Sequence, residues 1–152
     1  MTQVGKVQYT ARVHTTGGRD GGSSRSSDGR LDIKLSIPGL TGAGTNPEQL
    51  LAAGWSACFL SAIKIQAGKR KVKLPANLAI DAEVDLVNGE DGHFLQARIN
   101  VSLPGFELEV AKALIDAAEK NCPYSKATRG NIDVAIHVAV TQPNDDIVTS
   151  AA

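Results

Sequence analysis

The chain of 152 residues lacks the features that mark several classes of protein. It has only two cysteines, no excess charge of either sign (16 Lys and Arg against 16 Asp and Glu) and no long uninterrupted apolar run. Balanced charge argues against a nucleic-acid partner, because holding a phosphate backbone needs a concentrated excess of Lys and Arg. A domain of this size can fold without disulfide or metal staples. We therefore expect one domain over residues 1–142, followed by a mobile tail at 143–152.

The sequence also lacks the usual signs of export or membrane insertion. The first residues alternate between polar and apolar, without a basic segment before an apolar one, so we expect the mature chain to begin near Met1. The most apolar stretch, residues 50–65, is interrupted by Gly54, two serines and Lys64 and falls short of the ~20 predominantly apolar residues that span a bilayer. We expect this stretch to be a core helix and the protein to be cytoplasmic, with no membrane partner and with its cysteines in a reducing compartment.

Two periodicities predict the secondary structure. Alternation with period 2 predicts strands, and apolar residues at helical spacing predict helices. Asp28-Gly29 is typical of a hairpin turn, and Thr45 and Glu48 have the spacing of a capping box at a helix start. The predicted elements are strands at 4–14, 23–27 and 31–35, a helix at 45–68, strands at 78–86 and 95–103, a helix from Pro104-Gly105 to Cys122-Pro123, and a strand at 132–140. The order β-β-β-α-β-β-α-β predicts an α+β fold with a mainly antiparallel sheet around two helices.

The first predicted helix is apolar nearly all round. Its large side chains, among them Leu50, Trp55, Phe59 and Ile63, do not share a single stripe, so the helix should be covered on all sides. With two helices and only 4% aromatic residues, one subunit has little with which to cover it. We therefore expect an intertwined homodimer.

The two cysteines differ in their setting. Cys58 lies in the middle of the first helix, where a thiol is ordinarily an inert small apolar side chain. Cys122 lies at the end of the second helix, and a buried inert thiol remains an equal alternative there. No C-x-x-C spacing is present, which argues against a zinc or thioredoxin-like site.

The sequence does not support other common kinds of catalytic or binding site. His14, His93 and His137 are scattered, so no metal site is expected. The sequence has no G-x-S-x-G motif, which would indicate a serine nucleophile. The run Gly17–Gly22 lacks both the phosphate-loop and the dinucleotide spacings, so no nucleotide cofactor is expected.

Arg19 and Glu48 suggest a use for the thiols. Taken singly, Arg19 is a solvated loop charge and Glu48 a capping residue. A thiol beside a guanidinium can ionise, however, and a carboxylate can hold that guanidinium in place. Such a group of residues is what a peroxide-reducing cysteine requires.

Three separated motifs resemble one known family. They are Gly18-Arg19-Asp20-Gly21, the run Thr45 to Phe59 with Asn-Pro-Glu-Gln and Ser-Ala-Cys, and the run Asn121 to Asn131 that begins Asn-Cys-Pro-Tyr-Ser. Together they resemble the organic hydroperoxide resistance proteins, a group within the superfamily of osmotically inducible protein C, and the resemblance covers about residues 4–140. Leu51 and Trp55 depart from the aromatic and the tyrosine that are usual in the family, and the loop before Thr45 is short. These differences bear on pocket shape and substrate preference.

The resemblance implies a role for each of the four residues. Cys58 matches the peroxidatic cysteine, which becomes a sulfenic acid, and Cys122 matches the resolving cysteine, which forms a disulfide with it. Arg19 matches the arginine that stabilises the thiolate, and Glu48 the carboxylate that orients this arginine. The family is homodimeric, acts on alkyl and fatty-acid hydroperoxides, binds no cofactor and takes its electrons from dihydrolipoyl groups of lipoylated proteins.

Two alternatives to the function that the resemblance implies stay open. One is a related peroxidase of the same superfamily with a different peroxide preference. The other is a module without enzyme activity that binds an apolar ligand and merely buries its two cysteines.

Overall fold

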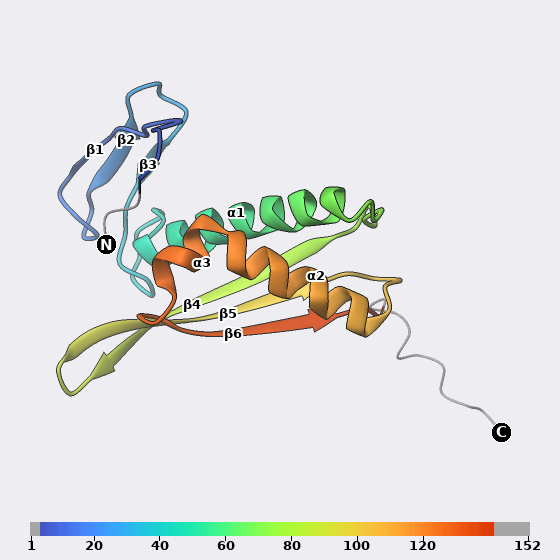
Figure 1. Ribbon diagram of the computed structural model, residues 1–152. Coiled ribbons are helices and arrows are strands. Elements are labelled where there is room, and N and C mark those ends of the chain that lie inside the picture. Colours follow the sequence, from blue (N-terminus) through green and yellow to red (C-terminus); the bar gives the residue numbers. More distant parts are fainter. Residues whose placement is uncertain (1–3, 142–152) are drawn as a thin grey trace. The chain divides into compact units, whose positions relative to one another are not determined.

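The computed structural model describes residues 4–141 (Figure 1), and the tail expected at 143–152 lies outside them. The chain divides into two compact units, Met1–Leu50 and Leu51–Ala152. In chain order the elements are β1 (Val13–Thr16), β2 (Ser23–Ser26), β3 (Asp32–Lys34), α1 (Pro47–Lys69), β4 (Ala79–Gly89), β5 (Gly92–Ser102), α2 (Leu108–Asn121), α3 (Pro123–Thr128) and β6 (Asp133–Ala139). The predicted α+β fold is confirmed, with one short helix, α3, in addition.

The first unit contains the predicted three-stranded meander. Strand β2 pairs with β1 and with β3, both antiparallel, and the turn between β2 and β3 holds Asp28-Gly29 as predicted. Gly29 has φ 73°, and the carboxylate of Asp28 accepts hydrogen bonds from Ser26 Oγ and the backbone N–H of Arg30. The turn residues thus satisfy their own polar groups and fix the register of the hairpin.

The first strand is shorter than predicted. The alternating pattern predicts a strand over residues 4–14, but only Val13–Thr16 forms one, and Val4, Val7 and Tyr9 are exposed. An alternating pattern becomes a strand only where a neighbouring strand supplies hydrogen-bond partners. Within the described residues, β1 pairs only from Val13 onward, with β2.

The second unit is built on the sheet β4-β5-β6. Strands β4 and β5 form a long hairpin closed at Gly89 and Gly92, at the loop predicted from Asn88 to Gly92. Strand β6 pairs with β5 in parallel, because the chain crosses over through α2 and α3 before it returns. Three of the four described strand pairings are antiparallel, which agrees with a mainly antiparallel fold, although the strands form two sheets of three.

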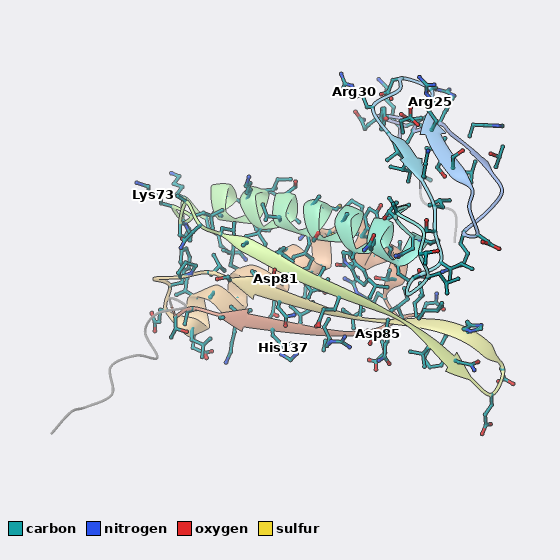
Figure 2. All side chains as sticks on the ribbon, turned by 180° about the vertical axis from the view of Figure 1, so that it is seen from behind. Arg25, Arg30, Lys73, Asp81, Asp85 and His137 are labelled. Atoms are coloured by element: carbon teal, nitrogen blue, oxygen red, sulfur yellow. The ribbon has the colours of Figure 1, made fainter. Side chains whose placement is uncertain are left out.

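The core of this unit lies between the sheet and its helices. Helices α1 and α2 cover the same face of the sheet (Figure 1). The buried side chains alternate along the strands, as in Ala97, Ile99 and Val101 of β5, and meet Phe59 and Ile63 of α1. On the other face, Asp81, Asp85 and His137 point away from the helices (Figure 2). The period-2 pattern of the sequence therefore separates a core face from a polar face.

One side of helix α1 packs into the core of this unit. Its buried residues include Trp55, Phe59 and Ile63, whereas Ile65 is 58% exposed. By length and composition alone α1 could cross a membrane, but the core helix of a soluble protein passes the same test. The prediction of a core helix is confirmed, and part of the apolar surface of α1 is left exposed in the single chain.

The break between α2 and α3 lies at the cysteine. Helix α2 ends at Asn121, as predicted from the following proline, because Cys122 has an extended backbone (φ −63°, ψ 124°). Pro123 then begins α3, since a proline is tolerated at the first position of a helix. Cys122 is therefore both the C-cap of α2 and the N-cap of α3, which fixes its backbone on both sides.

Candidate functional site

Two free cysteines of the second unit come together although 64 positions separate them in the sequence. Cys58 lies on α1, half-buried against the apolar core, and Cys122 is completely buried between α2 and α3. The thiol of Cys122 and the backbone N–H of Tyr124 lie close enough to the sulfur of Cys58 for both to influence its pKa. The structure thus places two free thiols beside each other.

The surroundings of Cys58 act on its pKa in opposite directions. Burial raises the pKa of the thiol above its ordinary value, and it is the largest influence. The hydrogen bond from the N–H of Tyr124 lowers the pKa, whereas the neighbouring Cys122 raises it. Within this unit Cys58 is therefore held as a thiol, and a nearby cation is needed to ionise it at neutral pH.

In the first unit, the structure brings Arg19 and Glu48 together. The Nη1 and Nη2 groups of Arg19 donate hydrogen bonds of 3.0 and 2.8 Å to the two carboxylate oxygens of Glu48. Such a forked pair fixes the plane of the guanidinium as well as its position. The Glu48 side chain is 12% exposed and that of Arg19 38% exposed. The Arg19 guanidinium lowers the pKa of Glu48, so the carboxylate is charged at neutral pH.

Glu48 is available for this pair because another residue caps the helix. The expected capping box of Thr45 and Glu48 is wrong, since Asn46 Oδ1 accepts the hydrogen bond from the backbone N–H of Gln49 at 2.9 Å. The helix therefore begins at Pro47, and Glu48 lies in its first turn, where the helix dipole favours a carboxylate. Both side chains can cap a helix, which is why spacing alone did not distinguish them.

The glycines around Arg19 form a tight turn. The backbone N–H of Gly22 donates to the carbonyl of Gly18 at 3.2 Å. A side chain at Gly22 would collide with the backbone carbonyls of Thr16 and Gly18. Gly17, Gly18 and Gly21 have positive φ. The glycine run therefore builds a defined loop, in which the forked contact with Glu48 holds Arg19.

Elsewhere the described residues give no metal site. No group of three or more His, Cys, Asp or Glu among residues 4–141 is placed to hold a metal ion. A pocket of about 510 Å³ in the second unit is lined by Trp55, Ser125 and Arg129 together with several acidic residues. The residues that line it do not include Cys58 or Cys122, so this pocket is separate from the thiol pair.

One residue at the thiol pair was not predicted. Tyr124 donates its backbone N–H to Cys58, and its ring lies against α1 at Gly54. The signal was present in Cys122-Pro123, because a proline often begins a helix and the first N–H groups of a helix lack partners within it. Taken only as the end of α2, the proline does not indicate these donors.

Comparison with known proteins gives the family. The family model described as OsmC-like protein matches residues 40–137. The chain belongs to the OsmC-like protein family. Within this family, the chain is 45% identical over 143 residues to the organic hydroperoxide resistance protein of Xanthomonas axonopodis pv. citri. The alignment covers 91% of this chain and 100% of the Xanthomonas protein. The resemblance noted from the three motifs is thereby confirmed.

Solved structures of OsmC-like proteins have the same fold. The crystal structure of the organic hydroperoxide resistance protein OhrB of Bacillus subtilis has a TM-score of 0.82 and 37% identity, covering 88% of this chain and 100% of that chain. A structure described as an organic hydroperoxide resistance protein from Legionella pneumophila has a TM-score of 0.83 and 40% identity, with 89% and 100% covered.

Proposed function

We propose that this OsmC-like protein is a cysteine-based peroxidase that reduces organic hydroperoxides to alcohols in the oxidative stress response. The contact between the thiols of Cys58 and Cys122 carries the proposal. The names of the relatives in Xanthomonas and Bacillus, organic hydroperoxide resistance proteins, supply the substrate class.

The thiol pair supports a cycle in two steps. The sulfur of Cys58 attacks the terminal oxygen of the hydroperoxide, the O–O bond breaks, and the alcohol leaves with a proton while Cys58 becomes a sulfenic acid. The thiol of Cys122 then attacks that sulfenic sulfur, and a disulfide forms with release of water. The peroxide gains two electrons and the pair of thiols loses two. Because Cys122 is already in contact with Cys58, the second step needs little movement.

The first step requires a thiolate, and we assign its stabilisation to Arg19. Burial raises the pKa of the Cys58 thiol, so a positive charge is needed beside it. Glu48 occupies two of the five N–H donors of Arg19 and leaves three for the sulfur and the peroxide. In this proposal Glu48 orients Arg19, and Arg19 stabilises the thiolate and polarises the O–O bond.

The disulfide must be reduced for a second turnover. A dithiol can do this by two exchange steps, which return both cysteines to thiols and oxidise the donor to its own disulfide. From the resemblance of the motifs to the family, we propose that the donor is the dihydrolipoyl group of a lipoylated protein and that the enzyme works in the cytoplasm.

We also propose that the enzyme is a homodimer. Helix α1 leaves Ile65 exposed, and the extended segment before β1 leaves Val7 and Tyr9 exposed. A second subunit would cover such apolar side chains. Sedimentation of the purified protein should give twice the chain mass of 15.9 kDa, and a species of single chain mass would contradict the dimer.

The function is tested by the consumption of an alkyl hydroperoxide with dihydrolipoamide as reductant. Cys58→Ser should abolish turnover because it removes the attacking sulfur. Cys122→Ser should still reduce about one equivalent of peroxide and should stall before disulfide recycling. Full sustained activity of Cys122→Ser would remove the resolving role.

The same assay separates the alternatives. The rate of peroxide consumption is measured in parallel with hydrogen peroxide. A rate that equals or exceeds the rate with the alkyl hydroperoxide would favour a related peroxidase with a different peroxide preference. Unchanged thiols after exposure to either peroxide would favour the module that only binds a ligand.

A further inference from the structure

The ring of Tyr124 lies against helix α1 at a glycine. A β-carbon at Gly54 would lie 2.6 Å from the hydroxyl oxygen of Tyr124, 3.1 Å from its Cζ and 3.6 Å from its Cε1. The first two distances are shorter than ordinary van der Waals contacts between such atoms. No residue with a side chain therefore fits at Gly54 while the ring keeps this position.

Gly54 and Cys58 are neighbours on the same face of α1. They stand four residues apart in the middle of the helix, and side chains at this spacing lie one above the other. The ring of Tyr124 thus lies one turn from the thiol that its own backbone N–H contacts. Tyr124 therefore lies close to this face of α1 through both its ring and its backbone N–H.

The same short segment carries the second thiol. Cys122 stands two residues before Tyr124, and its carbonyl accepts the first hydrogen bond of α3, from the N–H of Lys126 at 2.9 Å. Next to Tyr124, Ser125 Oγ accepts a hydrogen bond from Nε1 of Trp55 at 3.4 Å. Helix α3 is therefore joined to α1 at adjacent residues on both helices, Gly54 with Tyr124 and Trp55 with Ser125.

A glycine at this place is unfavourable for the helix alone. In a helix interior glycine is less stable than alanine, and Ala52, Ala53 and Ala57 surround it in the sequence. Gly68 of the same helix has no neighbouring atom within 4 Å of a β-carbon, so it experiences no such contact. The contact with Tyr124 explains why a glycine stands at position 54, and no such contact is present at Gly68.

We propose that Gly54 and Tyr124 are a positioning pair for the thiols: the missing side chain at Gly54 lets the Tyr124 ring lie on α1, which holds the Tyr124 N–H and the thiol of Cys122 at Cys58. This role rests on the proposed function of the two cysteines. A methyl group at Gly54 displaces the ring, and the displacement reaches Cys122 through two residues of backbone. The reduced pair is then less well placed to close into a disulfide.

The test is the equilibrium of the Cys58–Cys122 disulfide with oxidised and reduced dithiothreitol, which needs no peroxide. Gly54→Ala should lower the equilibrium constant for disulfide formation about tenfold, which is about 30 mV for a two-electron couple. Gly68→Ala is the matched control on the same helix and should leave the constant unchanged. Tyr124→Phe added to Gly54→Ala removes the oxygen that approaches most closely and should restore part of the loss. A positioning role predicts this rescue, whereas a general weakening of the helix does not.

The outcomes separate the two proposals. If the wild-type pair forms its disulfide and Gly54→Ala has the wild-type constant, the ring merely swings aside and the positioning role is overturned, while the peroxidase stands. If the wild-type pair forms no disulfide either in excess oxidised dithiothreitol or after one equivalent of an alkyl hydroperoxide, the resolving step fails and the positioning role fails with it. Should Gly54→Ala not fold, Tyr124→Ala at this partly exposed residue carries the test and should lower the constant likewise.

Discussion

Oxidation of the thiol pair should stabilise the protein strongly. A disulfide between Cys58 and Cys122 closes a loop of 65 residues, counted from 58 to 122 inclusive. In the chain-entropy treatment such a loop removes about 15 cal/mol/K from the unfolded chain, or about 4 kcal/mol at 25 °C. The two thiols already lie beside each other in the reduced protein, so closing the bond should need little movement of the backbone. We expect the free energy of unfolding to rise by about 2–4 kcal/mol on oxidation.

The assay is thermal unfolding of the fully reduced and fully oxidised protein. Trp55 is the only tryptophan and is 1% exposed, so its fluorescence reports the loss of the core around α1. For a chain of this length the expected gain corresponds to an increase in Tm of about 10 °C. Cys122→Ser treated with the same oxidant is the control and should show no such increase.

A disulfide that forms without raising Tm would contradict this expectation. If mass spectrometry shows the intramolecular disulfide and Tm stays equal or falls, then closing the bond distorts the native packing of α1 against α2 and α3. The thiols would then not be placed for a disulfide as their contact indicates.

Other contacts in the structure can be tested by substitution. Arg19→Lys should lower kcat/KM for an alkyl hydroperoxide about 10- to 100-fold with little change in Tm, because lysine cannot form the forked pair with Glu48; an unchanged kcat/KM would contradict the orienting role. Ile99→Ala should cost about 2–5 kcal/mol in urea unfolding, since Ile99 is fully buried on the central strand, and a loss below about 1 kcal/mol would contradict that packing. Arg98 lowers the pKa of Asp85 from 3.8 to about 2, so this carboxylate stabilises the fold above pH 4 and loses that contribution as pH falls toward 2. Asp85→Asn should flatten this part of the pH profile of Tm, and an unchanged profile would exclude the ion pair as its cause.

Much of the fold could be predicted from the sequence because the two periodicities are strong. The alternation in residues 78–86 and 95–103 locates β4 and β5, and the glycines near 89–92 locate their turn. The end of α2 followed from Pro123, a local steric effect. The pairing of residues 4–12 could not be read in the same way, because a strand depends on a partner elsewhere and the pattern of one segment does not name it.

The candidate site was predicted residue by residue, and the contacts came from the structure. That Cys58 and Cys122 meet depends on the packing of α1 against the junction of α2 and α3, which no spacing in the sequence encodes. The cap at Asn46 shows the limit of local patterns, because the side chains of Thr45 and Asn46 can both cap a helix and the spacing of Thr45 to Glu48 favoured the wrong one. Gly54 received no role from the sequence because its importance depends on a ring seventy positions away.

Titration of the free thiols after one equivalent of an alkyl hydroperoxide decides whether Cys58 and Cys122 are a peroxidatic and resolving pair. The reduced protein has two free thiols per chain. We expect that both are lost, with a mass two hydrogens lower and a Cys58–Cys122 linked peptide after digestion. Two thiols remaining, or Cys58 oxidised while Cys122 stays free, would contradict it.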